Sequence, residues 1–145
     1  MEQLRITKEF DFEMAHALYN HDGHCKHIHG HSYKLAVTIL GQVRNEFAHP
    51  HDGMVMDFGQ LKQIIKHYII DVFDHAFVVN EKAPYQNTPN EELYQKMIKV
   101  SYQPTCENMV LHFVDIIKKQ LPPHVQLVQL KLNETATSFA EWRIE

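Results

Sequence analysis

The chain has 145 residues, of which 44% are hydrophobic and 22% charged, and its formal net charge is −4 with all 12 histidines neutral. This length fits a single domain covering residues 1–145, and the composition is ordinary for a globular protein. The negative charge and the lack of any Lys/Arg-rich run argue against a nucleic-acid surface, and no apolar stretch is long enough for a membrane span.

The N-terminus and the cysteines bear on where the protein works. MEQLRITKEF contains no apolar core of the kind found in signal peptides. Cys25 and Cys106 stand in different contexts and form no disulfide framework. We therefore expect a reduced, cytoplasmic location.

Two segments in the first third of the chain alternate between apolar and polar residues. In residues 4–16 the apolar side chains fall on even positions, and in residues 31–43 they fall on odd positions. Such alternation is typical of half-buried antiparallel strands. The loop between them contains Asp22-Gly23, a turn signal.

Two amphipathic helices are expected next. Asp57 is a suitable N-cap for the first, whose apolar face comprises Leu61, Ile64, Ile65, Tyr68, Ile69 and Val72. The second starts at Thr105 and stops at Pro122-Pro123. Its apolar face comprises Val110, Phe113, Ile117 and Leu121. Between the helices, residues 79–104 form a polar insertion that could contain a short helix near 90–99.

Alternation returns in residues 125–134 and 139–144, so the expected order is β-β-α-α-β-β. This order predicts an α+β fold in which a four-stranded antiparallel sheet carries two main helices on one face. A sheet of this kind has two open edges, which favours pairing with other subunits.

The segment HCKHIHGH (24–31) is unusually rich in histidine. His29 and His31 continue the apolar row of the second strand, and His16 continues that of the first, so all three should face the same side. A lone histidine is most often a surface or satisfied core residue, but three in phase predict a metal site. Three imidazoles leave one position open on tetrahedral zinc, as in catalytic sites, although affinity alone also allows nickel or copper.

Three more positions have both a catalytic and a plainer interpretation. Cys25 could close the metal site as a fourth ligand, or act as a general base or nucleophile. Adjacent side chains seldom face each other, so Asp74-His75 is of interest only if the pair reaches Cys25 as a proton relay. Cys106, in the first turn of the second helix, is interpreted as a packed or capping-region residue.

Glu134 continues the apolar row formed by Val128, Leu130 and Leu132. Either the strand has already ended and the carboxylate is solvated, or the carboxylate lies at the floor of a pocket. In the second case it could accept two parallel N–H bonds from a guanidine-like ligand edge, such as that of a pterin or guanine.

The motifs FEMAH, CKHIHGH, MDFGQLK, FDH, PTCEN and NET occur in this order from about residue 8 onward. Together they resemble the 6-pyruvoyl-tetrahydropterin synthase superfamily. The spacing C-x3-H-G-H is similar to that of its 6-carboxy-5,6,7,8-tetrahydropterin synthase branch, which belongs to the queuosine pathway. Residues 83–103 are longer than in compact members of the superfamily and look like a surface elaboration.

The resemblance implies a role for each candidate residue. The Zn²⁺ ligands would be three histidines, namely His16, His29 and His31. The catalytic residue Cys25 would abstract the proton. Asp74 and His75, supplied by a neighbouring subunit, would be its catalytic relay partners. The pterin would be bound by Glu134, with Thr105 and Glu107 nearby. No motif fixes the residues that hold a triphosphate, for which Lys26 and Lys131 are the candidates.

The fold implied by the resemblance is the tunnelling fold, in which three subunits join their sheets into a barrel and two such rings stack into a homohexamer. The implied reaction converts 7,8-dihydroneopterin triphosphate to 6-carboxy-5,6,7,8-tetrahydropterin, acetaldehyde and triphosphate. The alternatives are the pyruvoyl reaction, which stops at triphosphate elimination and rearrangement, a zinc hydrolase, and a non-enzymatic histidine-rich metal-binding protein.

Overall fold

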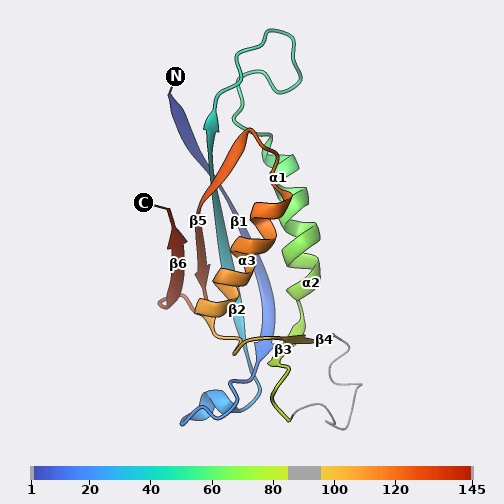
Figure 1. Cartoon of the computed structure of the whole chain (residues 1–145), viewed down its shortest axis with the longest axis vertical. Helices are drawn as coiled ribbons and strands as arrows, with labels where there is room; N and C mark the ends of the chain where they lie inside the picture. Colours follow the sequence, from blue (N-terminus) through green and yellow to red (C-terminus); the bar gives the residue numbers. More distant parts are fainter. Residues whose placement is uncertain (1, 85–95, 145) are drawn as a thin grey trace.

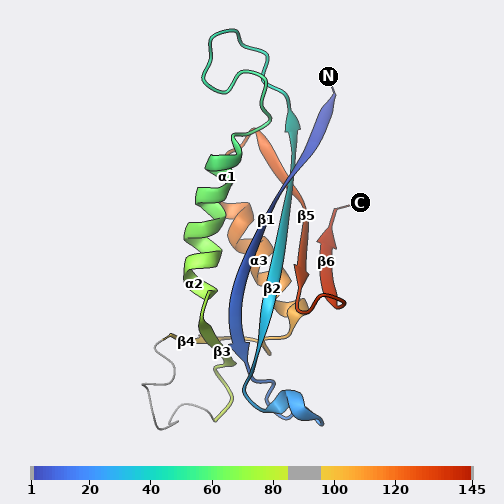
Figure 2. The same cartoon turned by 180° about the vertical axis from the view of Figure 1, so that it is seen from behind.

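The computed structural model describes residues 2–84 and 96–144, and a long twisted sheet runs along most of the molecule (Figure 1). The strands are β1 (Gln3–His16), β2 (His29–Gln42), β3 (Ala76–Asn80), β4 (Met97–Val100), β5 (Val125–Asn133) and β6 (Phe139–Arg143). The helical segments are α1 (Phe58–Ile65), a π-helical turn (Lys66–Ile70), α2 (Asp71–Phe73), α3 (Cys106–Gln120) and a short 3₁₀ turn (His24–Lys26). Views from the two sides place all the long helices on one face of the sheet (Figures 1 and 2).

The described sheet has six strands in the order β4-β3-β1-β2-β5-β6. The expected antiparallel strands correspond to β1, β2, β5 and β6, which pair with one another in that order. The expected α+β class is confirmed, but the count of four strands is wrong because β3 and β4 extend the β1 edge in parallel. The first four residues of β3 are all buried. A short strand buried on both faces shows no alternation, which is why its sequence gave no signal.

The short helix expected near residues 90–99 is not supported where the chain is described. Residues 85–95 lie outside the described part, and Met97–Val100 form strand β4 instead of a helix. β4 pairs in parallel with β3, so the end of the polar insertion belongs to the sheet.

The first predicted helix runs from residue 58 to residue 73 with a π-helical turn in its middle. Asp57 is its N-cap, and the carboxylate accepts hydrogen bonds from the N–H groups of Gly59 and Gln60. The wider π turn rotates the following residues around the axis. As a result Phe73 is buried while Val72, expected on the apolar face, is 41% exposed.

The second predicted helix is α3, and Thr105 is its N-cap, as expected. The Thr105 hydroxyl accepts a hydrogen bond from the N–H of Asn108 at 3.2 Å. Cys106 is buried in the first turn, and its thiol donates to the carbonyl of Leu132 at 3.2 Å. This contact ties the start of α3 to the end of β5 and agrees with the interpretation of Cys106 as a packed residue.

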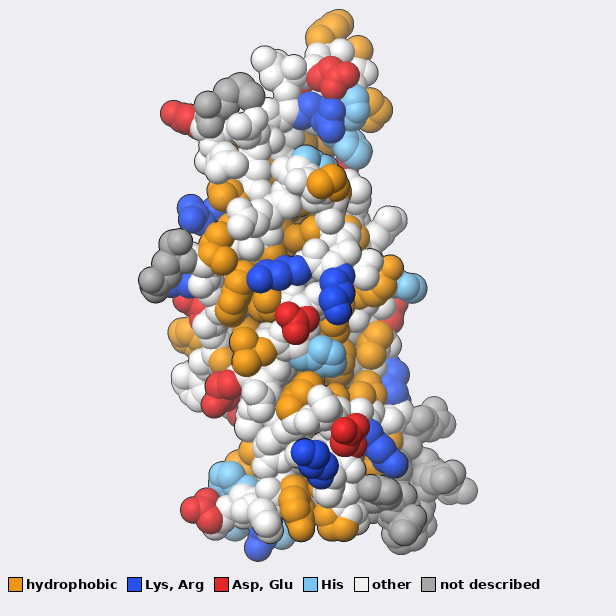
Figure 3. All heavy atoms as spheres, in the orientation of Figure 1, with side chains coloured by type: hydrophobic (Ala, Val, Ile, Leu, Met, Phe, Trp, Pro, Cys, Tyr) orange, Lys and Arg blue, Asp and Glu red, His pale blue; other side chains and the backbone are white. Residues whose placement is uncertain are grey.

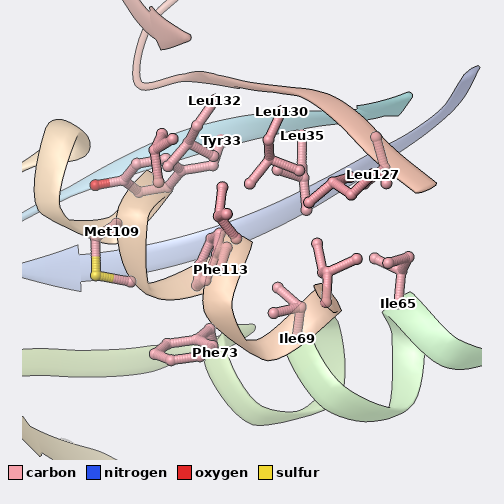
Figure 4. Packing of buried hydrophobic residues seen from close by; sticks show 14 of the residues in the cluster. Tyr33, Leu35, Ile65, Ile69, Phe73, Met109, Phe113, Leu127, Leu130 and Leu132 are labelled. Carbon is pink, nitrogen blue, oxygen red and sulfur yellow. The ribbon is translucent and has the colours of Figure 1, made fainter. Parts of the chain in front are cut away.

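The main hydrophobic core fills the space between the sheet and the helices (Figure 4). Phe113 of α3 lies at its centre, with its ring 6.2 Å from that of Phe12 on β1 and 5.1 Å from that of Phe73. Leu35 of β2 and Leu130 of β5 pack from the sheet side and are fully buried. The solvent side of the helices is mixed, with apolar, basic and acidic side chains interspersed (Figure 3).

Removal of the Phe113 ring should therefore destabilise the fold strongly. We expect Phe113→Ala to lower the free energy of unfolding by about 3–5 kcal/mol, because a cavity would remain between the sheet and both helices. Leu111→Ala is the matched control in the same helix, since Leu111 is 55% exposed, and should cost about 0.5 kcal/mol or less. Urea unfolding followed by circular dichroism measures both, and equal losses would contradict this view of the core.

Candidate active site

Three histidines converge at the end of the sheet where β1 finishes and β2 begins. The last three pairs of the β1–β2 ladder are Met14↔His31, Ala15↔Gly30 and His16↔His29. One ligand nitrogen from each of His16, His29 and His31 lies within 4.8 Å of the other two. The ring centroids are 4.5–5.2 Å apart. The structure thus brings together the three residues that strand parity placed on one side.

Two of these imidazoles are held by backbone carbonyls through their Nδ1 atoms. His16 Nδ1 is 2.7 Å from the carbonyl oxygen of Pro104, and His29 Nδ1 is 2.8 Å from that of His27. A carbonyl can only accept, so each Nδ1 carries the proton and each Nε2 keeps its lone pair. The Nε2 atoms of His16 and His31 are buried without a hydrogen-bond partner among the described residues. His16 combines both features, an orphaned Nε2 lone pair and a carbonyl-bound Nδ1–H, which is the usual arrangement of a metal-binding histidine.

The electrostatics of the cluster favour neutral imidazoles. The pKa of His16 is lowered to about 4, mainly by burial; the neighbouring histidines contribute to this lowering, and the bond to the Pro104 carbonyl opposes it. Burial also lowers the pKa of His31, partly offset by the negative charge of Glu134. Near pH 7 the rings of His16 and His31 therefore offer lone pairs, and a set of three imidazoles fits Zn²⁺ or a similar divalent ion.

Glu134 faces this cluster from the residue that follows β5. Its carboxylate oxygens lie 3.9 Å from His16 Nε2 and 3.8 Å from His31 Nε2, and its side chain is 27% exposed. The backbone N–H of Glu134 donates to the carbonyl of Ser138 at 2.9 Å, which turns the chain toward β6. Of the two interpretations of Glu134, the geometry favours a carboxylate directed into the site.

Tyr33 lies in the odd-numbered apolar row of β2, for which the sequence pattern predicts only packing. It follows His31 on the same face of β2, is 1% exposed, and its hydroxyl has no hydrogen-bond partner among the described residues. Burial, together with the nearby Glu134 and Cys106, raises the pKa of Tyr33, so the phenol remains an O–H donor. The pattern H-x-H-x-Y, with all three polar side chains in one row, was the available signal.

Cys25 lies in the 3₁₀ turn between β1 and β2 and is half-buried. The turn is fastened to the end of β1 because the carbonyl of Cys25 accepts the N–H of Leu18 at 2.9 Å. Within residues 2–84 and 96–144, the Cys25 thiol is not among the ligand atoms that converge. The three histidines therefore converge without the thiol, which argues against Cys25 as a fourth ligand.

Asp74 and His75, adjacent in sequence, do face each other. His75 adopts a φ of 62°, and its N–H donates to the carbonyl of Glu13 at 2.5 Å. The Asp74 carboxylate accepts the N–H of Glu13 at 2.9 Å and lies 3.0 Å from His75 Nδ1. Burial acts to raise the pKa of Asp74, but these hydrogen bonds outweigh it and the pKa is lowered. The imidazole is thus oriented by an ionised carboxylate and is 77% exposed.

The other predicted ligand-binding residues are spread around the cluster. Thr105 follows Pro104, whose carbonyl holds His16, so the start of α3 borders the site. Glu107 lies in the first turn of α3 and is exposed. Lys131 alternates with the buried Leu130 and Leu132, so it lies on the opposite face of the sheet, 4.1 Å over the Phe139 ring. Lys131 is therefore badly placed to hold an anion at this site, whereas Lys26 lies beside Cys25.

Comparison with known proteins gives a consistent match along nearly the whole chain. The sequence model of the 6-pyruvoyl tetrahydropterin synthase family matches residues 5–145. The 6-carboxy-5,6,7,8-tetrahydropterin synthase of Haemophilus influenzae is 37% identical over 96% of this chain and 98% of its own. The enzyme of that name from Aquifex aeolicus is 31% identical over 97% and 98%.

Solved structures share the fold at lower identity. An uncharacterized protein from Wolinella succinogenes superposes with a TM-score of 0.82 at 22% identity and covers 100% of both chains. Caenorhabditis elegans 6-pyruvoyl tetrahydropterin synthase superposes with a TM-score of 0.69 at 22% identity, covering 100% of this chain and 98% of its own. Among the described helices, none is long and apolar enough to cross a membrane.

The three-histidine cluster makes a direct prediction about metal affinity. Loss of an outer-sphere partner typically weakens metal affinity by roughly 10–100-fold. We expect His16→Ala to weaken Zn²⁺ binding by more than this, because the substitution removes a ligand itself. His67→Ala is the matched control, since His67 is an exposed residue of the π-helical turn. Competition against a chromophoric chelator measures both affinities. Equal Zn²⁺ affinities for the two variants would show that the metal binds elsewhere.

Proposed function

Because the chain belongs to the 6-pyruvoyl tetrahydropterin synthase family, we propose that it is a zinc-dependent lyase acting on 7,8-dihydroneopterin triphosphate. With one water consumed, the products would be 6-carboxy-5,6,7,8-tetrahydropterin, acetaldehyde and triphosphate, made in the cytoplasm for queuosine biosynthesis. The observation that carries this proposal is the cluster of His16, His29 and His31 opposite Glu134, in which two buried Nε2 atoms lack partners.

Each residue near the cluster has a chemical role in this proposal. Glu134 would accept N–H bonds from the pterin edge and fix the ring. A Zn²⁺ ion held by the three histidines would make the hydroxyl groups of the substrate side chain more acidic. The Cys25 thiolate would remove a carbon-bound proton next to the ring. His75, oriented by Asp74, would then carry protons to and from the side chain.

The relay pair would be supplied by a neighbouring subunit of a homohexamer built as a dimer of trimers. In support, no hydrogen bond joins Asp74 or His75 to Cys25 of the same chain within the described residues. His75 is also largely exposed, as expected of a residue that completes a site across an interface. β6 is an edge strand of the sheet and presents backbone groups that another sheet could pair.

The carboxy reaction is favoured over the pyruvoyl reaction by two features. One is the spacing between Cys25 and His29-Gly30-His31, and the other is the name shared by several relatives that match nearly the full chain. Both reactions need the same first proton abstraction, so the site residues serve either. A metal-storage role is less consistent with the structure, because three of the 12 histidines form the one such cluster among the described residues.

Product analysis tests the proposed function. We expect the zinc-loaded protein, incubated with 7,8-dihydroneopterin triphosphate, to release acetaldehyde and a carboxylated tetrahydropterin identified by mass. Cys25→Ala should keep its zinc and lose at least about 100-fold in turnover, because proton transfer by a positioned side chain contributes about that much or more. His24→Ala, in the same turn, is the control and should remain active.

The outcomes separate the alternatives. A pyruvoyl product would assign the chain to the other reaction of the family, and turnover that survives Cys25→Ala would favour a zinc hydrolase. Zinc binding without any turnover would instead favour a storage protein.

The shared-site arrangement makes a separate prediction. Cys25→Ala and His75→Ala subunits should each be inactive, but co-refolded mixtures should regain turnover, because some sites then combine an intact Cys25 with an intact His75. Steady-state assays of the mixture against each variant alone measure this. Mixtures that stay inactive would place all the catalytic residues of a site on one chain.

A further inference from the structure

The hydroxyl of Tyr33 is a polar group that the proposed mechanism does not use. Its side chain is 1% exposed, and its oxygen makes no hydrogen bond to any described residue. The ring stacks on Phe12 with centroids 5.1 Å apart and planes 8° from parallel. Phenylalanine would provide the same packing without burying an unpaired O–H, which costs free energy. Packing alone therefore does not account for a tyrosine here.

The Tyr33 hydroxyl points toward the histidine end of the sheet. Figure 4 shows it directed away from the aliphatic core, along the sheet toward the end of β1. The ring centroid is 5.6 Å from that of His31 and 6.4 Å from that of His16. The β2–β5 ladder ends at Lys34↔Asn133; extended by one residue, its register puts Glu134 opposite Tyr33, and the charge of Glu134 does act on the Tyr33 phenol. Directly opposed residues on one face are close enough for their side chains to touch.

The position of the Glu134 carboxylate creates a conflict at the metal site. Its oxygens lie 3.8 and 3.9 Å from two of the imidazole nitrogens, so a small movement would let it bind the same ion as His16 and His31. Zinc bonds to carboxylate oxygens and imidazole nitrogens are both about 2.0–2.2 Å long. A fourth protein ligand would close the site to substrate. The carboxylate must therefore be held away from the ion if it is to bind a ligand.

We propose that Tyr33 is a positioning residue: once an ion occupies the histidine cluster, its hydroxyl donates a hydrogen bond to the Glu134 carboxylate, a bond not formed in this structure, and keeps the carboxylate out of the metal coordination sphere. The inference rests on the proposed function, because only a site that admits substrate needs an open coordination position. The buried Tyr33 hydroxyl is a donor that lacks a partner, and the Glu134 carboxylate is the acceptor opposite it. A hydrogen bond to an ionised acceptor is among the stronger ones available to a tyrosine.

Cobalt binding tests this role without any substrate. We expect Tyr33→Phe to bind Co²⁺ about tenfold more tightly than wild type and to change the visible spectrum of bound Co²⁺, because Glu134 becomes a ligand when its hydrogen bond is lost. The Tyr33→Phe/Glu134→Gln double variant should return to the wild-type affinity and spectrum. Tyr102→Phe is the matched control, since its hydroxyl is bonded to His112 and Met109, and should match wild type.

Three results would overturn the inference. The first is a Tyr33→Phe protein with wild-type affinity and spectrum, and the second is a change in Tyr33→Phe that persists after Glu134→Gln is added. The third is a single Glu134→Gln variant with an altered Co²⁺ spectrum, since Glu134 should not be a ligand in the wild type. This last test does not depend on Tyr33→Phe folding. None of these readouts requires turnover, so they distinguish failure of this inference from failure of the proposed reaction.

Discussion

The unbroken ladder between β1 and β2 determines where the three imidazoles lie. It runs without a bulge from Gln3↔Gln42 to His16↔His29, and the histidines lie at its end. A slip of one residue would turn one strand's side chains to the opposite face and separate His16 from its partners. The register is held by the apolar residues of the same rows, including the stacked rings of Phe12 and Tyr33. The packing of the hydrophobic core therefore determines the geometry of the site.

Segments far apart in sequence supply the other groups of the site. The carbonyl of Pro104, just before α3, fixes the ring of His16, while the end of β5 delivers Glu134. The thiol of Cys106 bonds to Leu132, which joins these two segments to each other. The catalytic thiol of the proposal comes from the turn that links β1 to β2. A shift in any of these packed elements would be transmitted to the orientation of an imidazole or a carboxylate.

Much of this arrangement could be predicted from the sequence, because alternation in a strand specifies which face a side chain occupies. Parity alone brought His16, His29 and His31 together, and it identified Glu134 as a carboxylate in a buried row. Strand β3 and the carbonyl that holds His16 have no such periodic signal. Strand β3 is buried on both faces, and the Pro104 carbonyl is a backbone group whose partner depends on tertiary packing.

Local geometry explains two other departures from expectation. Asp74 and His75 face each other because His75 adopts a positive φ and its backbone N–H binds β1, which no general rule for neighbouring residues anticipates. The face of the first helix shifts after residue 65 because a π-helical turn intervenes, so Phe73 replaces Val72 in the core.

The X-ray absorption spectrum of the zinc-loaded protein tests the central claim most directly, namely that three imidazoles from paired strands hold an ion with one position left for a small ligand. The account predicts only nitrogen and oxygen neighbours at about 2.0–2.1 Å, with the outer-shell scattering of three imidazole rings. A sulfur neighbour at about 2.3 Å would make Cys25 a ligand and contradict it, as would a spectrum with fewer than three imidazoles.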